Sequence, residues 1–169
     1  MSAAASSNSL SQIRLVAFDV DGVFTDGRFY LSDAGVESKA FNTQDGYGVR
    51  RLIESSIDVA VISGRESAAV AHRMAELGVA HVIQGCKDKV AALDELTAKL
   101  DISAAQCVYV GDDVPDLPLL QKVGYAVAVA NAVAEVRQQC DYTTMAAGGH
   151  GAVREICELV LASHGGAAQ

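Results

Sequence analysis

Tryptophan is absent from this chain of 169 residues, and only 5% of the residues are aromatic although 50% are hydrophobic. Val, Ile, Leu and Ala must therefore fill the core, in a single domain long enough to bury a sizeable one. No apolar run reaches the roughly 18 residues that a membrane helix needs, so we expect no membrane partner. Residues 1–11 contain no Lys or Arg. We therefore expect a disordered tail rather than a secretory signal there, and a cytoplasmic location.

Positive charge is scarce as well: the chain has 13 Lys and Arg residues and 21 Asp and Glu residues, which gives a formal net charge of −8. This balance argues against a nucleic-acid partner. It does not exclude an anionic substrate, since a metal ion or a local group of cations reverses the field within one cleft. The four cysteines and four histidines are dispersed and form no C-x-x-C pair or zinc-binding spacing. We therefore expect buried free cysteines rather than disulfides or a zinc site.

Short apolar runs alternate with helical patterns along the chain. The runs are Leu15–Phe18, Val59–Ile62, Val82–Ile83, Cys107–Val110 and Ala126–Val129. Because they are continuous rather than alternating, they predict strands of a parallel sheet covered on both faces. We therefore predict an α/β fold, a Rossmann-like doubly wound parallel sheet. One domain would span residues 13–163, with tails at 1–12 and 164–169.

The segments between these runs carry helical spacing. Apolar residues recur every three or four positions in three segments: Val70, Met74 and Leu77; Val90, Leu93, Leu96, Thr97 and Leu100; and Val153, Ile156, Cys157 and Val160. This spacing predicts helices that bury one face. Gly78 stands where a helix would end before the next strand.

One segment breaks the alternation. Two strand-like runs, Arg28–Leu31 and Val36–Phe41, flank the polar turn Ser32–Gly35. This pattern predicts a β-hairpin. The hairpin would project between the first strand and the first long helix, which we start near Asp45.

Acidic residues follow two of the predicted strands. Asp19 and Asp21 come directly after the first, and Asp112 follows the run that ends at Val110. Since ligands bind beyond the carboxyl ends of parallel strands, we expect these carboxylates to meet at one edge of the sheet. Together they would repel one another unless a cation lay among them, and hard oxygen ligands suit Mg²⁺. One carboxylate could also attack phosphorus as a nucleophile, and a second could transfer protons.

Ser63 and Lys89 would complete a phosphate site at the same edge. Each candidate has a structural alternative. Ser63 begins an S-x-x-E sequence and could be only a helix cap, and Lys89 alone could be a solvated helix residue. Asp113 and Asp116 flank Pro115 and are typical of a cap and a first turn, so they could support the site from outside.

The order of these pieces resembles a known superfamily. Asp19-Val20-Asp21-Gly22-Val23, Ser63-Gly64, Lys89 and Gly111-Asp112-Asp113 are similar to the four motifs of the haloacid dehalogenase superfamily of phosphohydrolases. The resemblance implies that Asp19 is the phosphorylated nucleophile and Asp21 the general acid and base. It also implies Mg²⁺ held by Asp19, the backbone carbonyl of Asp21 and Asp112, with Lys89 binding the phosphate and Ser63 in the position of the family's Ser or Thr.

Within that superfamily, residues 13–163 resemble the 3-deoxy-D-manno-octulosonate 8-phosphate phosphatase family. Further matching motifs are Asp26-Gly27, Lys39–Asn42, Asp45–Arg50, Gln84-Gly85 and Ala147–Glu155. The resemblance implies a sugar-acid phosphate substrate and a role in lipopolysaccharide precursor synthesis. The positions that would line the substrate pocket are Asp21, Asn42, Thr43, Gln44, Asp45, Gly46, Arg50, Arg65, Arg73 and Lys89. His150 departs from the family pattern, and the tail past Ser163 is short. For this reason we make no prediction of contacts from a C-terminal lid.

The spacing leaves no room for a cap domain over the site. The segment after residue 21 holds only the hairpin, and the segment after residue 62 holds one helix and one strand. An uncapped site must gain its walls elsewhere. Relatives form tetramers in which hairpins pack together, so the resemblance implies a homotetramer. The hairpin residues that would suit such burial are Phe29, Tyr30, Val36 and Phe41.

Three alternative functions remain open at this point. A sister group acts on nine-carbon sialic-acid-type 9-phosphates. Its pattern has an acidic residue where this chain has Arg65 and a basic residue where this chain has Glu76. Both differences favour the eight-carbon substrate. A phosphotransferase would have to exclude water, which an uncapped site does not favour. A noncatalytic assembly domain would not need the intact Asp19, Asp21 and Asp112.

Overall fold

The computed structural model describes residues 10–165. Its centre is a sheet of six parallel strands in the order β5-β4-β1-β6-β7-β8. The strands are β1 (Leu15–Phe18), β4 (Asp58–Ile62), β5 (His81–Ile83), β6 (Cys107–Gly111), β7 (Tyr125–Ala128) and β8 (Tyr142–Thr143). A separate antiparallel hairpin is formed by β2 (Tyr30–Leu31) and β3 (Glu37–Ser38).

The order in which the chain enters the sheet determines where a ligand can bind. The chain starts in the middle with β1 and adds β4 and β5 on one side, then crosses to β6, β7 and β8 on the other. The connections that leave the adjacent strands β1 and β6 therefore diverge. In open α/β sheets, ligands bind at such a switch point, beyond the carboxyl ends of the strands.

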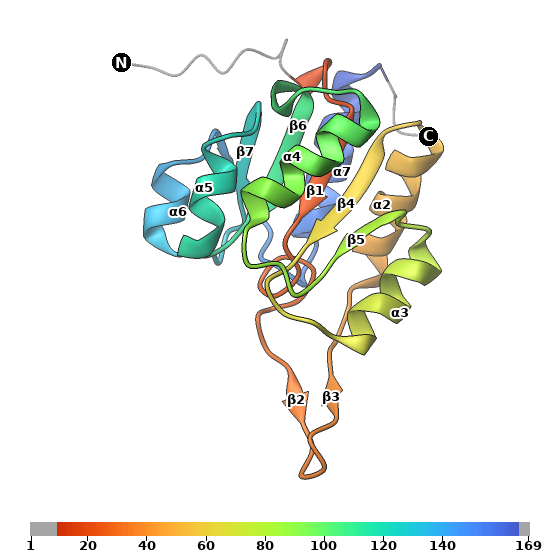
Figure 1. Cartoon of the computed structure of the whole chain (residues 1–169), viewed down its shortest axis with the longest axis vertical. Coiled ribbons are helices and arrows are strands. Elements are labelled where there is room, and N and C mark those ends of the chain that lie inside the picture. The colour runs from red at the N-terminus through yellow and green to blue at the C-terminus, as the bar shows by residue number, and fades with distance from the viewer. Residues whose placement is uncertain (1–9, 166–169) are drawn as a thin grey trace.

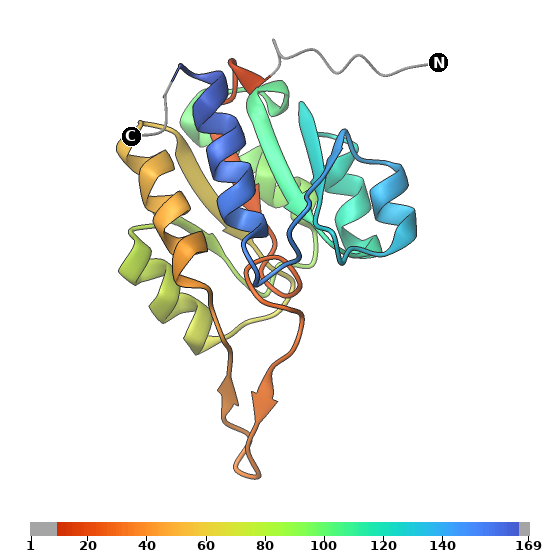
Figure 2. The ribbon, with the colours of Figure 1, turned by 180° about the vertical axis from the view of Figure 1, so that it is seen from behind.

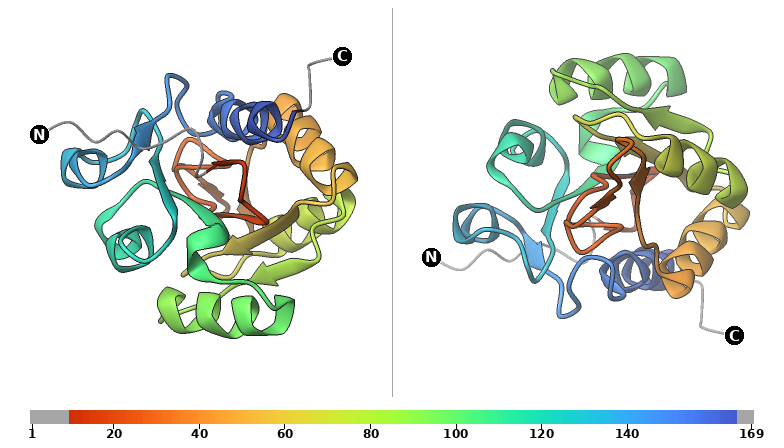
Figure 3. Two further views of the ribbon diagram at one scale, coloured as in Figure 1. Left: turned by 90° about the horizontal axis from the view of Figure 1, so that it is seen from above. Right: turned by 90° about the horizontal axis from the view of Figure 1, so that it is seen from below.

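Helices cover both faces of this sheet. The helices α2 (Thr43–Glu54) and α7 (Ala152–Ser163) pack side by side on one face, which Figure 2 shows in front. The helix α4 (Lys89–Leu100) covers the opposite face, in front in Figure 1, and the sheet lies between these layers in Figure 3. Further elements are α3 (Ala68–Leu77), α5 (Leu117–Leu120), α6 (Ala134–Gln138) and the 3-10 turns η1 (Ala104–Gln106) and η2 (Val114–Asp116).

The predicted doubly wound α/β fold is confirmed. The five predicted strands are present, and all residues of β1, β6 and β7 are buried, as continuous apolar runs require. The sixth strand, β8, was missed because it has only two residues and no apolar run. The helix α2 begins at Thr43, earlier than expected, because the side chain of Asn42 caps it by accepting a hydrogen bond from the Gln44 N–H.

The predicted helical faces pack against the core, although in α4 the residues Val90 and Leu100 are only partly buried. Val70, Met74 and Leu77 are buried, and α3 ends at Gly78, whose φ of 80° is left-handed. The buried face of α7 contains the four predicted residues, Val153, Ile156, Cys157 and Val160. Among the cysteines, Cys107 and Cys157 are buried and Cys86 and Cys140 are partly exposed, and all four are free.

The predicted hairpin is present and stands away from the body of the molecule (Figure 1). Its turn is closed by a hydrogen bond of 3.0 Å from the Ser32 N–H to the Val36 carbonyl. Several of its apolar side chains face solvent, with Tyr30 75%, Leu31 64% and Val36 63% exposed. Such exposure is typical of a contact surface. Phe41 differs from these residues because it packs partly against the core of its own chain.

The limits predicted for the domain fall partly outside the described residues, which exclude 1–9 and 166–169. Within the segment predicted as an N-terminal tail, Leu10 is buried against the core. Near the other limit, Nε2 of His164 lies 3.0 Å from the carbonyl oxygen of Ile13. No helix within residues 10–165 is long and apolar enough to cross a membrane.

Candidate active site

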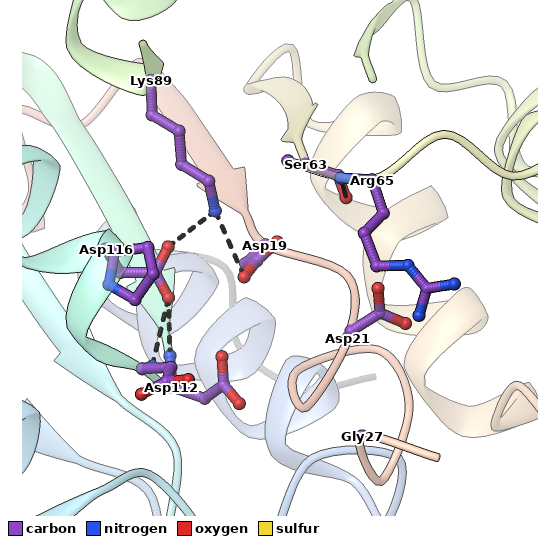
Figure 4. Close-up of a pocket in the computed structure, with 11 residues that line it drawn as sticks. Asp19, Asp21, Gly27, Ser63, Arg65, Lys89, Asp112 and Asp116 are labelled. Carbon is purple, nitrogen blue, oxygen red and sulfur yellow. Dashed lines mark hydrogen bonds and ion pairs between the residues drawn. The ribbon is translucent and has the colours of Figure 1, made fainter. Parts of the chain in front are cut away.

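The carboxyl ends of β1, β4 and β6 deliver side chains to one cavity of about 310 Å³ (Figure 4). Its lining residues are Asp19, Asp21, Gly27, Ser63, Gly64, Arg65, Lys89, Asp112, Asp113, Pro115 and Asp116. The structure therefore brings together Asp19, Ser63 and Asp112, which directly follow β1, β4 and β6 and were predicted to meet at one edge of the sheet. Their meeting follows from the parallel arrangement, which puts these strand ends at the same edge.

Lys89 reaches into the cavity from the first position of α4, whose N-terminus is capped by the side chain of Asp88. Its Nζ lies 3.2 Å from Oδ2 of Asp19, 2.7 Å from Oδ1 of Asp116 and 3.1 Å from the hydroxyl of Tyr109. An ammonium group has three hydrogens, so these acceptors can engage all of them. A phosphate oxygen that enters the site must therefore replace one acceptor.

Asp116 connects the phosphate side of the cavity to the strand behind it. Its Oδ1 accepts hydrogen bonds from the Tyr109 hydroxyl at 2.7 Å and from Lys89. Its Oδ2 accepts from the backbone N–H groups of Asp112 at 3.0 Å and Asp113 at 3.3 Å. The carboxylate is buried, and these four donors compensate for its lost hydration. Asp116 thus holds Lys89 and the start of the loop after β6.

The electrostatics of the cavity show a shortage of positive charge. Burial, with a further contribution from the charge of Asp116, raises the pKa of Asp19 to about 6. Burial and the charges of Asp19 and Asp116 raise the pKa of Asp112 to about 7. Burial alone would lower the pKa of Lys89, but the carboxylates of Asp19 and Asp116 outweigh it and raise the pKa. Five carboxylates and two cations line the cavity.

The donor atoms fit a hard divalent cation. Carboxylate oxygens of Asp19, Asp112 and Asp116 lie within 4.8 Å of one another. Because Asp116 is already bonded to four donors, Asp19 and Asp112 are the two carboxylates suited to hold an ion. Mg²⁺ prefers such oxygen ligands and would offset the repulsion that raises the pKa of both groups. The third predicted ligand, the backbone carbonyl of Asp21, lies in the same loop as Asp19.

Close backbone packing holds the loop after β1. Gly22 has a φ of 85°, and a Cβ there would lie 1.9 Å from Oδ2 of Asp112. A Cβ on Gly148 would lie 1.8 Å from the carbonyl oxygen of Gly22. The Asn131 side chain joins the two segments, since its Nδ2 donates to the Gly22 carbonyl at 3.1 Å and its Oδ1 accepts from the Gly148 N–H at 2.6 Å. Glycine is therefore required where this loop meets Asp112.

Two of the open sequence alternatives are resolved. The interpretation of Ser63 as a helix cap is wrong, because α3 begins at Ala68 with Ser67 in the cap position. Ser63 is instead buried at the end of β4 and lines the cavity. Asp113 does cap η2, as the sequence predicted, with its Oδ1 accepting from the Val114 N–H at 2.8 Å.

Only some of the residues predicted to line a sugar-acid pocket also line this cavity. Arg65 lines the cavity, but Arg50 and Arg73 do not. Arg50 donates to the backbone carbonyl of Glu76 at 2.9 Å, and Arg73 pairs with the Glu76 carboxylate at 2.8 Å. The segment from residue 42 to 46 also lies outside the cavity lining and forms the start of α2.

Asp45 of that segment connects two helices. It is buried, and its Oδ1 accepts a hydrogen bond of 2.9 Å from the backbone N–H of Arg154, in the first turn of α7. The residue in the cap position of α7 is Gly151, which has no side chain to do this. Asp45 therefore stabilises the N-terminus of α7 from a neighbouring helix.

Two contacts of the site could not be found from the sequence. Tyr109 lies within an apolar run, and only the structure shows its hydroxyl beside Lys89. Lys39, just after β3, contacts the carboxylate of Asp21. Lys39 opens one of the motifs that carried the resemblance, but nothing in that motif indicates which residue it meets.

Comparisons with known proteins show which family this chain belongs to. Residues 80–156 match the family of haloacid dehalogenase-like hydrolases. The 3-deoxy-D-manno-octulosonate 8-phosphate phosphatase of Escherichia coli is 48% identical over 153 residues, which are 90% of this chain and 81% of that protein. The Yersinia pestis protein of the same name is 47% identical over 151 residues, or 89% of this chain and 81% of the relative.

Solved structures show the same relationship. The Yersinia pestis phosphatase superposes with a TM-score of 0.94 at 44% identity, covering 96% of this chain and 88% of that one. The Moraxella catarrhalis phosphatase superposes with a TM-score of 0.92 at 45% identity, covering 94% of this chain and 91% of that one. That structure is a complex with a magnesium ion, a phosphate ion and a KDO molecule. This chain therefore belongs to the 3-deoxy-D-manno-octulosonate 8-phosphate phosphatase family of haloacid dehalogenase-like hydrolases.

Proposed function

We propose that this chain is a Mg²⁺-dependent phosphatase that converts 3-deoxy-D-manno-octulosonate 8-phosphate into 3-deoxy-D-manno-octulosonate and phosphate. The observation that carries the proposal is the position of Asp19, a largely buried carboxylate at the switch point of the sheet, 3.2 Å from Lys89. The relatives reported above are phosphatases of this substrate, and their similarity extends over nine-tenths of the chain. The product would enter lipopolysaccharide precursor synthesis.

In the first half-reaction, Asp19 is the nucleophile. Its carboxylate oxygen forms a bond to phosphorus while the bond from phosphorus to the sugar oxygen breaks, which gives an aspartyl-phosphate. Lys89 and the hydroxyl of Ser63 bind the nonbridging oxygens, where charge changes in the transition state. Asp21 donates a proton to the departing sugar oxygen.

In the second half-reaction, water attacks the phosphorus of the aspartyl-phosphate. Asp21, now a carboxylate, accepts a proton from that water. The bond from phosphorus to Asp19 then breaks, which regenerates the free carboxylate and releases inorganic phosphate. Asp116 keeps Lys89 in place through both steps by its contact of 2.7 Å.

The proposed cofactor is Mg²⁺, held by Asp19, Asp112 and the backbone carbonyl of Asp21. When bound, it neutralises part of the charge that the phosphate and the acidic residues bring together. Arg65 is the proposed sugar-acid contact that lines the cavity itself. The positions 42–46, Arg50 and Arg73 would have to contact substrate from outside this cavity.

We further propose that the protein is a homotetramer in the cytoplasm. Each subunit would contain one catalytic domain, over residues 13–163. The exposed apolar side chains of the hairpin support this assembly, because a neighbouring subunit that covered them would also add walls to an uncapped site. Light scattering measures the oligomeric state. A stable, fully active monomer would contradict the tetramer without affecting the chemistry.

The direct experiment is phosphate release by the full chain with Mg²⁺ from the eight-carbon and nine-carbon sugar-acid phosphates. We expect a higher kcat/KM for the eight-carbon substrate, and a preference for the nine-carbon one would overturn the substrate assignment.

Asp19→Asn should lower kcat by about 10⁴-fold or more, since it removes the nucleophile. Glu54→Gln, which alters an exposed carboxylate at the end of α2, is the matched control. Full activity in Asp19→Asn would contradict the mechanism.

A further inference from the structure

The base of the hairpin touches the proposed acid and base directly. Nζ of Lys39, the residue after β3, contacts Oδ1 of Asp21. The side chain of Lys39 is fully buried. Because a buried ammonium group is costly unless it is paired, the position of Lys39 and the position of the Asp21 carboxylate depend on each other.

Further contacts hold Lys39 in its place. Its Nζ lies 3.4 Å from Oε1 of Glu37 and 5.7 Å from the centre of the Phe29 ring. Nη2 of Arg65 lies 2.5 Å from Oε2 of Glu37, and its guanidinium lies 4.1 Å from the centre of the same ring. Lys39, Glu37, Arg65 and Phe29 form what we call the hairpin-base cluster. Both cations of the cluster thus contact the same carboxylate, that of Glu37, and the same aromatic ring, that of Phe29.

The cluster lies on the opposite side of Asp19 from the phosphate-binding lysine. In Figure 4, Asp21 and Arg65 stand on one side of Asp19, and Lys89 and Asp116 stand on the other. A phosphoryl group on Asp19 would therefore be held from one side and exchange protons on the other. Lys39, which contacts the Asp21 carboxylate, belongs to the hairpin and not to the sheet.

We propose that Lys39 is a positioning residue that orients the Asp21 carboxylate for proton transfer, so that the hairpin base does part of the work of a cap domain. This inference rests on the function proposed above. A correctly placed acid or base contributes about 10²- to 10⁴-fold to a reaction rate. Loss of Lys39 should therefore act on proton transfer and leave nucleophilic attack by Asp19 intact.

The leaving group separates these two effects. A sugar alkoxide is a poor leaving group without a proton, whereas p-nitrophenolate departs unprotonated. The test uses single-turnover kinetics with enzyme in excess and Mg²⁺ present, so that only the first half-reaction is measured. Lys39→Met should slow sugar release from the eight-carbon substrate by about 10²-fold and nitrophenolate release from p-nitrophenyl phosphate by less than about threefold. Equal slowing of both would overturn the inference.

Two controls sharpen the result. Lys99→Met removes an exposed lysine from the last turn of α4, and both rates should stay at the parent's values. The second control is a double variant that combines Lys39→Met with Asp21→Asn. If Lys39 acts through Asp21, the double variant should release sugar no more than about threefold more slowly than Asp21→Asn alone. A further loss of about 10²-fold would show that Lys39 acts independently of Asp21.

Folding is monitored by thermal denaturation of every variant. If Lys39→Met does not fold, the same pair of rates is measured on Lys39→Gln, which keeps a polar group near Glu37. An equal loss on both substrates there also overturns the positioning role. A parent enzyme that releases product from neither substrate would instead contradict the proposed function, so the two failures are distinguishable.

Discussion

The hydroxyl group of Tyr109 donates a hydrogen bond of 2.7 Å to Oδ1 of Asp116 and lies 3.1 Å from Nζ of Lys89. Tyr109 is fully buried in β6. Its ring is packed in the core, so it offers a rigid attachment for the lysine that faces Asp19. Burial and the charge of Asp116 also raise the pKa of the Tyr109 hydroxyl well above its usual value, which keeps it a neutral donor.

Tyr109→Phe removes this hydroxyl and keeps the ring. We expect the free energy of unfolding to fall by about 1–3 kcal/mol, because a buried hydrogen bond to a charged group is lost. We expect kcat to fall by about three- to tenfold, because Lys89 keeps both carboxylates but loses one restraint. Urea denaturation and steady-state kinetics measure the two effects. Tyr125→Phe in β7, outside the cavity lining, should leave kcat unchanged. An unaltered kcat in Tyr109→Phe would contradict the positioning of Lys89 by Tyr109.

Gly22→Ala tests the packing of the loop after β1 against Asp112. The substitution adds a Cβ 1.9 Å from Oδ2 of Asp112 at a φ of 85°. We expect a loss of about 2–4 kcal/mol in unfolding free energy, from backbone strain and overpacking together, and loss of most activity. Gly78 has a similar φ of 80°, and no atom of residues 10–165 lies within 4 Å of the Cβ that Gly78→Ala would add. This variant should lose only about 1–2 kcal/mol and keep its activity. Equal effects of the two variants would contradict the close fit.

Much of this site could be predicted because it depends on strand ends. A continuous apolar run such as Leu15–Phe18 indicates both a buried parallel strand and the edge where its next residue emerges. For that reason Asp19, Ser63 and Asp112 were expected at one edge, and the cavity contains all three. The strand β8 was missed because two residues carry no periodicity.

Contacts that depend on how a segment folds back could not be predicted. Lys39 meets Asp21 only because the hairpin returns to the sheet edge, and sequence patterns do not specify the direction of a hairpin. Asp45 was expected in a substrate pocket, and no sequence pattern indicated that its carboxylate would also lie at the N-terminus of α7. The related signal in the sequence is Gly151, which precedes α7 and has no side chain that could cap this helix.

Removal of metal should make the stability of the enzyme depend on Asp112. Burial and the charge of Asp19 raise the pKa of Asp112 from 3.8 to about 7. The folded state therefore binds this proton more tightly than the unfolded state, and the resulting stability is lost as pH rises through about 7. In chelator at about pH 8, Asp112→Asn should be more stable than the parent, because it removes one buried charge from the cluster.

Addition of Mg²⁺ should reverse that order. At about 100 times its Kd, Mg²⁺ should raise the unfolding free energy of the parent by about 2.7 kcal/mol, and that of Asp112→Asn much less. Thermal denaturation with and without Mg²⁺ measures both differences. Equal stabilisation of the parent and the variant would show that Asp112 does not bind the ion.

Glu158 joins helices α2 and α7 through two arginines. It accepts hydrogen bonds from Nη1 of Arg51 at 2.8 Å and from Nε of Arg154 at 2.7 Å. Burial alone would raise the pKa of Glu158, but the hydrogen bonds from Arg154 and Arg51 outweigh it and lower the pKa below 4.5. The stability that this group adds is therefore present above pH 4.5 and is lost as pH falls through the lowered value.

Glu158→Gln should accordingly unfold more easily than the parent at about pH 7, by about 0.5–1 kcal/mol, since a third of the side chain is exposed and solvent screens the pair. The difference should shrink toward zero as the pH falls well below 4.5, because the parent then carries a neutral carboxyl as well. Urea denaturation across this pH range measures it, with Glu54→Gln at the exposed end of α2 as the control. A difference that stayed constant with pH would mean that the substitution acts through packing, and that the charge of Glu158 does not hold the two helices together.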